Sequence, residues 1–268
     1  MISILPVFVV LVAFILYFYG SRWREQRLRN KPLPAEWLAI LVAGVPVYSS
    51  LSQSEKSRLH QLIQLFIAKK RFYGCAGLTI TDEMRVTIAA EACLLLLNKG
   101  WSVYPKLSSV LVYPTAFRVE REQHQADGTV ASGSHNLLGE SWSNGRVILS
   151  WDDVELGVSV FTDGHNVVLH EFAHQLDAES GSTNGAPPLR RNSYKSWATI
   201  FSENFEDLSA RSLHRHKTVM DEYGTTNPAE FFAVATETFF EKPHQLFKKR
   251  PELYAELSQY YQLDPRNW

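Results

Sequence analysis

The sequence predicts an α+β fold, with helices around a small mixed sheet, preceded by one N-terminal transmembrane helix. Three observations lead to this class. Residues 2–19 form an uncharged apolar run, helical periodicity follows in residues 52–98, and strand-like segments gather between residues 107 and 151. From Asn166 onward the pattern is again mainly helical. Helices, then strands, then helices favour an α+β domain over alternating βαβ units.

The apolar run of residues 2–19 predicts a membrane anchor. As a helix it spans roughly 27 Å at ~1.5 Å per residue, close to the ~30 Å hydrocarbon core of a bilayer. Basic residues follow at once: Arg22, Arg24, Arg27, Arg29 and Lys31. A cleaved signal peptide would instead need basic residues before the run and a small-x-small site after it, and neither is present. The positive-inside rule then places the remainder of the chain in the cytoplasm.

Three segments follow from this division of the chain. Residues 1–21 form the transmembrane anchor, residues 22–46 a basic juxtamembrane linker that leads into the domain, and residues 47–268 the folded domain. Pro32, Pro34 and Pro46 mark the linker.

Local signals set the expected elements of the domain. Ser52 and Glu55 predict a capping box at the start of the first helix. The second helix opens at Thr81 and runs to about residue 98. Strands are expected at residues 107–112, 117–120 and 146–151, with loops that can include a short strand over residues 126–145. A later helix spans residues 166–176 and can be capped by Thr162 or Asp163.

Composition limits the classes of partner and of metal site. The net charge of −1 and the pI of about 6.8 give no basic excess of the kind that nucleic-acid binding requires. Only Cys75 and Cys93 occur, so no disulfide framework is expected, and Cys93 lies in an apolar run. A metal ion must therefore be held by histidines and carboxylates.

The run His170-Glu171-Phe172-Ala173-His174 predicts a zinc site on the helix of residues 166–176. His170 and His174 are four residues apart, which puts their Cβ atoms on one face about 5–6 Å apart. Two imidazoles so placed can converge on one zinc ion at about 2.0–2.1 Å. Glu171 lies beside that face and can act as a general base without binding the metal.

A catalytic zinc site needs a third protein ligand and one open position. The extended pattern HExxHxxGxxH is excluded, because its Gly and last His positions are occupied by Asp177 and Ser180. The remaining candidates are Asp177, Glu179, Glu230, Glu237, His214 and His216. Glu230 is the best of them, because it opens an apolar helix that Asn227 caps. The same spacing suits a capping box, so the residues alone leave ligand and cap equally open for Glu230.

The segment Tyr223-Gly224-Thr225-Thr226-Asn227-Pro228-Ala229-Glu230-Phe231-Phe232-Ala233 resembles part of the catalytic domain of anthrax lethal factor. It is also similar to the Mlc titration factor (MtfA-like) family of bacterial zinc peptidases. In both, an HExxH helix is followed by a tyrosine, six intervening residues and the third-ligand glutamate, which is the separation of Tyr223 and Glu230. For the MtfA-like family the likeness extends over nearly the whole soluble part, including residues 167–177, 227–240 and 260–265.

The resemblance implies a zincin-like (gluzincin) metallopeptidase fold with one Zn²⁺ per chain. It implies that His170, His174 and Glu230 bind the metal, that Glu171 is the base, and that Tyr223 donates a hydrogen bond to the oxyanion. It further implies aminopeptidase-like hydrolysis of a peptide or protein substrate. The soluble members of the family have a regulatory protein partner, the glucose-responsive repressor Mlc, and the apolar N-terminal segment of this chain departs from them.

Other readings of the same residues stay open from the sequence. Asp177 and Glu237 each lie seven residues after a candidate ligand, so either can orient a ligand imidazole, although a salt bridge or an exposed helix end is favoured for Glu237. Tyr223 can be an ordinary turn residue, and residues 214–217 a solvated basic stretch. For the whole chain, one rival function is a regulatory zinc-fold binding protein that sequesters a cytoplasmic partner such as a transcriptional repressor. A second rival is a membrane-anchored scaffold without metal.

Overall fold

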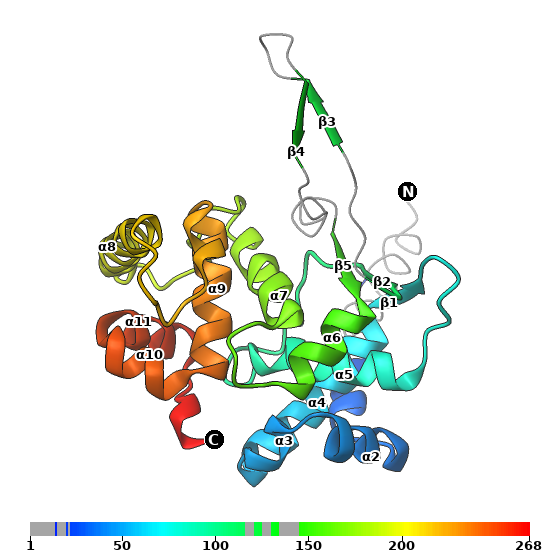
Figure 1. The fold of residues 1–268 in the computed structure, drawn as a ribbon. Coiled ribbons are helices and arrows are strands. Elements are labelled where there is room, and N and C mark those ends of the chain that lie inside the picture. The colour runs from blue at the N-terminus through cyan, green and yellow to red at the C-terminus, as the bar shows by residue number, and fades with distance from the viewer. Residues whose placement is uncertain (1–13, 15–19, 21, 116–120, 125–129, 134–144) are drawn as a thin grey trace, which may run out of the picture.

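A computed structural model describes residues 14, 20, 22–115, 121–124, 130–133 and 145–268 (Figure 1). Its helices are α2 (Ala35–Gly44), α3 (Val47–Ser50), α4 (Gln53–Lys69), α5 (Asp82–Leu94), α6 (Trp151–Ser159), α7 (Val167–Ala178), α8 (Tyr194–Leu213), α9 (Pro228–Glu241), α10 (Pro243–Lys249) and α11 (Pro251–Tyr261), with short 3-10 helices at Glu222–Thr225 and Pro265–Asn267. Its strands are β1 (Arg71–Gly74), β2 (Ser109–Tyr113), β3 (Arg121–His124), β4 (Val130–Gly133) and β5 (Arg146–Ser150). This helix-rich α+β arrangement confirms the predicted class.

The central sheet has the strand order β1-β2-β5, and both of its strand pairs are parallel. The expectation of a mixed sheet was wrong for these strands. Parallel neighbours need a long crossover, and residues 75–108, which contain α5, supply one between β1 and β2. Among the described strands, antiparallel pairing occurs in the separate hairpin of β3 and β4.

The two faces of this sheet differ in burial. Val110, Val112, Val147 and Leu149 are fully buried on the face that packs against the helices. Side chains alternate between faces along a strand, so the first and third residues of β1 and β5 point the other way. On that opposite face, Arg71, Tyr73 and Arg146 are exposed.

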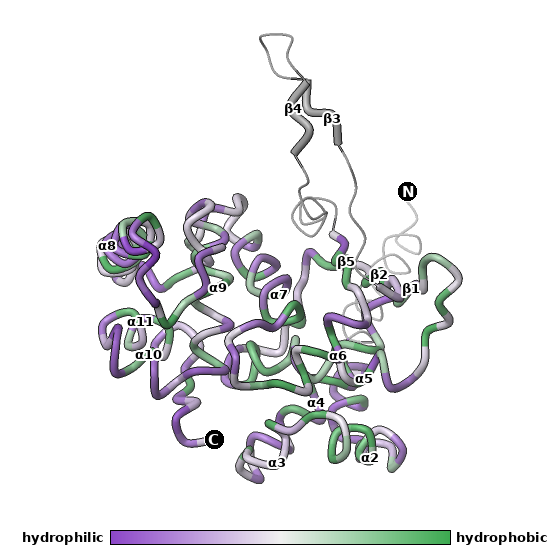
Figure 2. Tube along the Cα trace, viewed as in Figure 1, coloured by the Kyte–Doolittle hydropathy of each residue, from purple (hydrophilic) through white to green (hydrophobic). Residues whose placement is uncertain are grey.

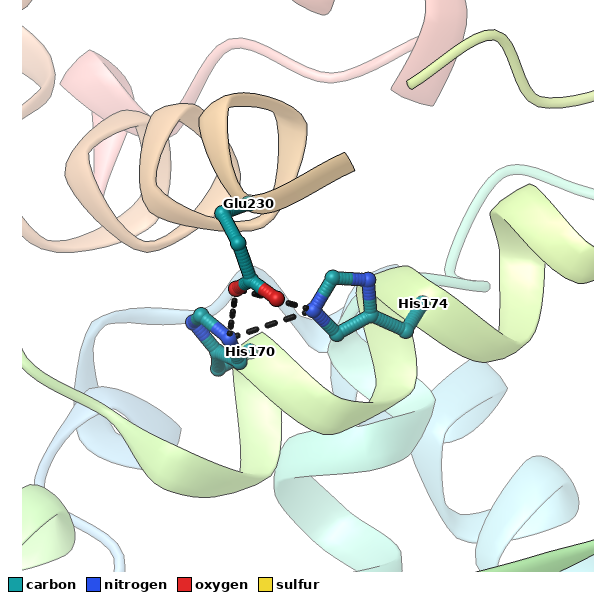
Figure 3. Close-up of side chains that lie close together, drawn as sticks. All are labelled: His170, His174 and Glu230. Carbon is teal, nitrogen blue, oxygen red and sulfur yellow. Dashed lines mark hydrogen bonds and ion pairs between the residues drawn. The ribbon is translucent and has the colours of Figure 1, made fainter. Parts of the chain in front are cut away.

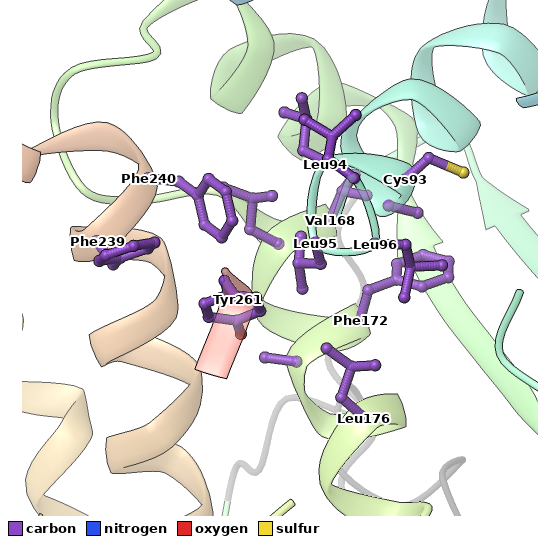
Figure 4. Close-up of a cluster of buried hydrophobic side chains, with 14 of the residues drawn as sticks. Cys93, Leu94, Leu95, Leu96, Val168, Phe172, Leu176, Phe239, Phe240 and Tyr261 are labelled. Atoms are coloured by element: carbon purple, nitrogen blue, oxygen red, sulfur yellow. The ribbon is translucent and has the colours of Figure 1, made fainter. Parts of the chain in front are cut away.

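The hydrophobic core lies where α5, α7, α9 and α11 meet. Figure 4 draws part of it, with Phe172 of α7, Phe239 of α9 and Tyr261 of α11 pointing into a common interior. The ring centroids of Phe239 and Tyr261 are 5.6 Å apart. Cys93 is fully buried there, as the sequence predicted for a small apolar residue. In Figure 2, green marks the apolar residues, which occur along both α2 and α5.

The N-terminal predictions have a mixed outcome. No helix among the described residues is long and apolar enough to cross a membrane. The expected anchor, residues 1–21, lies outside the described residues except for Phe14 and Gly20. Part of the expected linker is folded, because residues 22–29 are helical and Leu41 of α2 is fully buried in the core. Helix α2 is therefore packed against the folded domain.

Most local signals in the domain are confirmed. Ser52 Oγ accepts from Glu55 N, and Glu55 Oε2 accepts from Ser52 N, which completes the predicted capping box of α4. Thr81 caps α5, which ends at Leu94 rather than near residue 98. The strand predicted at residues 146–151 is β5, and that at 107–112 is β2, shifted by a residue or two. The candidate at residues 117–120 lies outside the described residues.

Candidate metal centre

Helix α7 carries both histidines, and Asn166 sets where this helix begins. Asn166 Oδ1 accepts a hydrogen bond of 2.9 Å from Leu169 N, so Asn166 is the N-cap. The expectation that Thr162 or Asp163 caps the helix was wrong. Asp163 Oδ1 instead accepts from His165 N within the preceding turn. With the helix begun at Val167, His170 and His174 both face α9.

His170, His174 and Glu230 converge on one point (Figure 3). Glu230 Oε2 lies 3.0 Å from His170 Nε2 and 3.3 Å from His174 Nε2, and the two Nε2 atoms are 3.2 Å apart. Donors about 2.0–2.1 Å from a tetrahedral ion are about 3.3–3.4 Å from one another. The three atoms therefore fit a single divalent metal ion with little movement.

The role of Glu230, left open between cap and ligand, is decided by where its carboxylate points. Asn227 Oδ1 caps α9 by accepting from both Ala229 N and Glu230 N. The carboxylate of Glu230 is directed across to the histidines of α7. The other third-ligand candidates are not part of a metal-binding cluster among the described residues, where His170, His174 and Glu230 form the one such group.

The electrostatics of two of the three groups, His174 and Glu230, suit a cation. Burial lowers the pKa of His174 to about 4, against the opposing effect of Glu230, so this imidazole is neutral and has a lone pair to offer. Burial alone would raise the pKa of Glu230, but its hydrogen bonds to both histidines lower it to about 2. Glu230 is thus an anion at neutral pH. Metal ligands must be deprotonated in this way.

Glu237 holds the other side of the His170 ring. Its Oε1 lies 2.7 Å from His170 Nδ1, and it is buried with only 6% of its surface exposed. Burial alone would lower the pKa of His170, but Glu237 and Glu230 raise it well above its usual value. A carboxylate on the remote nitrogen of a ligand histidine fixes the orientation of the ring. Because Glu237 is buried, the expectation of an exposed helix end was wrong, whereas the expected salt bridge is present, with His170 Nδ1 as its partner.

Asn166 joins this carboxylate to two more. Its backbone N donates to Glu237 Oε2 at 2.6 Å, and its Nδ2 donates to Glu91 Oε1 at 2.8 Å. The same side chain hydrogen-bonds Glu241, which in turn accepts from Gly164 N at 2.7 Å. Burial raises the pKa of both Glu91 and Glu241 to about 8. Helices α5, α7 and α9 are thereby tied together directly behind His170.

Asp177 does not orient a histidine, contrary to one of the alternatives. Its Oδ2 accepts a hydrogen bond of 2.6 Å from Gly185 N. Gly185 has a φ of 80°, and a Cβ there would lie 2.3 Å from Pro228 O at the start of α9. Asp177 therefore fixes a loop that packs tightly against the first turn of the helix that carries Glu230.

Glu171 and Tyr223 border the cleft beside the three ligands. This cleft has a volume of about 330 Å³, and both residues line it together with Leu156, Val167 and Val234. Glu171 is fully buried, whereas Tyr223 is half-exposed with its ring centroid 5.9 Å from that of His170. Burial and the nearby carboxylates of Glu230 and Glu171 raise the pKa of Tyr223 to about 12. Like any tyrosine, Tyr223 keeps its hydroxyl hydrogen at neutral pH, and its position in the lining of the cleft is what distinguishes it from an ordinary turn residue.

The charged side chains that line the cleft are acidic or histidine. Among its described lining residues, carboxylates are supplied by Asp153, Asp221 and the glutamates already named, and none of the lining residues is Lys or Arg. Helix α11 contributes no lining residue within the described chain, because its tyrosines are buried in the core. The basic stretch of residues 214–217 is exposed away from the site, as predicted.

Sequence reasoning missed Asn166, Glu91 and Glu241. One signal was available for Glu91, since it is the single charged residue in the largely apolar stretch of residues 86–97. An isolated acid on a buried helix must be neutral or paired. Nothing in the sequence indicates that its partner is the residue that caps another helix.

Comparison with known proteins agrees with this geometry. The family described as "Glucose-regulated metallo-peptidase M90" matches residues 20–262. An uncharacterized protein of Synechocystis sp. is 44% identical over 266 residues, covering 97% of this chain and 96% of its own. Mlc titration factor A of Serratia proteamaculans is 31% identical over 246 residues, covering 91% and 92%. Mlc titration factor A of Yersinia pestis is 30% identical over 242 residues, covering 88% of each chain. With a His-His-Glu cluster beside a cleft and a match over most of its length, the chain belongs to the glucose-regulated metallo-peptidase M90 family.

Proposed function

We propose that this chain is a zinc-dependent peptidase that hydrolyses peptide bonds, with aminopeptidase-like activity and Glu171 as the general base. The observation that carries the proposal is the mutual spacing of 3.0–3.3 Å among one carboxylate and two imidazole atoms beside an open cleft. Two imidazoles and a carboxylate are the ligand set of the catalytic zinc in thermolysin-type enzymes.

A bound zinc ion would supply Lewis acidity and lower the pKa of a water molecule to about 7. The residues of the chain carry the rest of the reaction. Glu171 accepts the proton of the attacking water and passes it to the leaving amine. Tyr223 donates its hydroxyl hydrogen to the oxygen that becomes negative as the carbonyl is attacked. Glu237 keeps the His170 ring in the orientation that ligation needs.

A peptide substrate can enter along the edge of the central sheet. Strand β5 is the last strand in the order β1-β2-β5, and it leads directly into α6, whose Leu156 lines the cleft. A peptide that adds to this edge would gain main-chain hydrogen bonds and lie across the mouth of the site. The exposed Leu156 and Val160 offer apolar contact to its side chains.

The anchor and the cytoplasmic location are part of the same proposal. The family match begins at residue 20, and the alignment with the cyanobacterial relative covers 97% of this chain and so includes most of residues 1–21. The apolar run of residues 2–19 and its C-terminal basic flank support a single membrane pass with the peptidase domain facing the cytoplasm.

The alternative is a regulatory zinc-fold protein that sequesters a protein partner. It is favoured by the name Mlc titration factor A, which the Serratia and Yersinia relatives carry and which implies a regulatory interaction of those proteins. Both Glu171 and Tyr223 line the cleft of this chain, and a purely structural site needs neither. A metal-free scaffold is disfavoured by three convergent ligand atoms.

The test combines elemental analysis with a peptide-library digest by the full chain. About one zinc per chain is expected, and His174→Ala should abolish its binding because the fully buried Nε2 of this residue has no substitute. Cleavage should cease on chelation and return when zinc is restored. Bound zinc with no cleavage of any peptide would support the binding protein instead, and absence of zinc would support the scaffold.

A further inference from the structure

A second cavity lies apart from the metal centre. It has a volume of about 920 Å³ and opens at the amino ends of the three parallel strands. Arg71, Ser109 and Arg146, the first residues of β1, β2 and β5, stand in register along its wall. It shares no lining residue with the cleft that holds Glu171.

This cavity is part of a sheet face that the described residues leave open. Parallel sheets normally have both faces covered. Here one face packs on the helices, while on the other Tyr73 is 48% exposed and Leu111 is only partly buried. An open parallel sheet with an aromatic side chain on it is a surface that a partner can cover.

The helix of residues 22–29 is fastened beside the cavity. Glu25 Oε1 lies 2.7 Å from Lys69 Nζ, and Lys69 lines the cavity. The guanidinium of Arg29 lies 4.2 Å from the centroid of the Trp101 ring, which precedes the lining residue Ser102. The chain that follows the apolar run thus meets the domain at the amino end of the sheet.

The charges on this side are positive and largely unpaired. Within the described ranges, the side chains of Arg71 and Arg146 form no ion pair or hydrogen bond. Two acids lie close by: Glu25 pairs with Lys69, and Glu179 acts on the buried Lys70, whose Nζ donates to two backbone carbonyls. We use "basic face" for the exposed cations of this side, namely Arg22, Arg24, Arg27, Arg71 and Arg146.

Aromatic side chains are interspersed with these cations. Trp23 is 62% exposed, and Trp101 is 39% exposed under the guanidinium groups of Arg29 and Arg58. Tryptophan and tyrosine favour the boundary between lipid and water, and arginine side chains reach from that boundary to phosphate groups. The combination of both at the point where an anchor joins the domain matches an anionic membrane surface.

We propose that the basic face docks on the anionic headgroups of the membrane in which the N-terminal segment is anchored. The proposal rests on the anchor that forms part of the proposed function. Clusters of arginine next to a transmembrane helix are attracted by anionic lipids on the cytoplasmic leaflet. Docking covers the open sheet face and holds the domain in one orientation. The metal cleft stays accessible, because it is lined by other elements.

Hydrogen exchange of the full chain in lipid nanodiscs tests the docking. Discs of phosphatidylcholine alone are compared with discs that also contain phosphatidylglycerol. In the anionic discs, amides of residues 71–74 and 101–111 should exchange about tenfold more slowly than in the neutral discs. High salt should remove the difference, because it screens charges at the membrane surface.

Matched variants separate docking from general charge. Arg71→Glu with Arg146→Glu should weaken docking by about thirtyfold or more and abolish the lipid-dependent protection. Lys195→Glu with Lys217→Glu makes the same charge change at exposed positions in α8 and the loop after it, across the molecule from β1 in Figure 1, and should leave the protection intact.

Two outcomes are distinguishable. A chain that fails to insert into the discs contradicts the anchor. Even then, the difference in hydrogen exchange between neutral and anionic discs measures whether the basic face binds anionic lipid. Equal exchange in neutral and anionic discs, or protection that survives in Arg71→Glu with Arg146→Glu, overturns the docking proposal while leaving the peptidase proposal untouched.

Discussion

Glu171 directly follows His170 in the chain, but its side chain lines the cleft and is not one of the three groups that converge. Because it is fully buried and lines the cleft, removing its charge should affect proton transfer without opening the metal site. We expect Glu171→Gln to keep about one zinc per chain and to lower kcat by ~10²–10⁴-fold. Elemental analysis and a fluorogenic peptide assay measure both quantities.

Glu155→Gln is the matched control for this substitution. Glu155 is exposed on α6, the helix that forms one wall of the cleft, and it lines neither the cleft nor the ligand set. It should keep full activity. Undiminished turnover by Glu171→Gln would remove the general base from the proposed mechanism.

Tyr223 contributes one hydroxyl to the cleft, and its ring packs near that of His170. Tyr223→Phe keeps the ring and removes only the donor. We expect zinc content and the free energy of unfolding to stay unchanged while kcat falls by ~10²–10³-fold, the usual effect of losing one oxyanion donor. A loss of zinc in this variant would mean that Tyr223 acts as a ligand and not as an oxyanion donor.

At the residue scale the sequence identified the three side chains that converge, but not the buried groups that contact them. His170, His174 and Glu171 follow from one motif on one helix, since spacing of four fixes a shared face. Tyr223 and Glu230 were identified through resemblance to a family. For Glu237 the sequence favoured a salt bridge or an exposed helix end. The salt bridge is present, but its partner His170 is 67 positions away, and no local pattern identifies it.

At the scale of elements, Asn166 links the start of α7 to α5 and α9. Asn166→Ala removes the cap bond to Leu169 N and the hydrogen bond to Glu91. We expect it to lower the free energy of unfolding by ~1–3 kcal/mol. The backbone N–H of residue 166 can still donate to Glu237 Oε2. Without the side-chain cap, however, the turn that carries this N–H is less firmly held behind His170, so zinc affinity should also fall by about tenfold or more. Chelator competition and urea unfolding give the two values.

Ser52→Ala provides the comparison, because Ser52 caps α4 away from the metal centre. It should lower the free energy of unfolding by ~1 kcal/mol and leave zinc affinity unchanged. If Asn166→Ala reduces stability alone, as Ser52→Ala should, Asn166 is only a helix cap.

At the scale of the whole molecule, buried carboxyls make stability depend on pH. Burial raises the pKa of Glu91 to about 8, while its ordinary value is 4.5. Between these values the folded protein holds a proton that the unfolded chain releases. The stabilisation is therefore complete below pH ~4.5 and is lost as the pH rises through about 8.

Glu91→Gln should flatten this dependence. The amide that replaces the carboxyl is neutral at every pH and can still accept from Asn166, so the slope of unfolding free energy between pH 6 and 8 should fall by up to ~1.4 kcal/mol per pH unit. Urea unfolding with a chelator present measures it without competition between protons and metal. Glu83→Gln, exposed near the start of the same helix, should leave the slope unchanged. An unaltered slope in Glu91→Gln would show that Glu91 is ionised in the folded protein.

The sequence by itself determined the α+β class, the helix that presents His170 and His174, and the caps at Ser52, Thr81 and Asn227, because each depends on periodicity or spacing within about one turn of chain. The parallel strand order, the packing of α2 and the group formed by Asn166, Glu91, Glu237 and Glu241 were decided only by the tertiary structure. These features join residues up to 77 positions apart, as Gly164 and Glu241 are. No local pattern encodes which distant partners meet, since that depends on how the helices pack around a shared core.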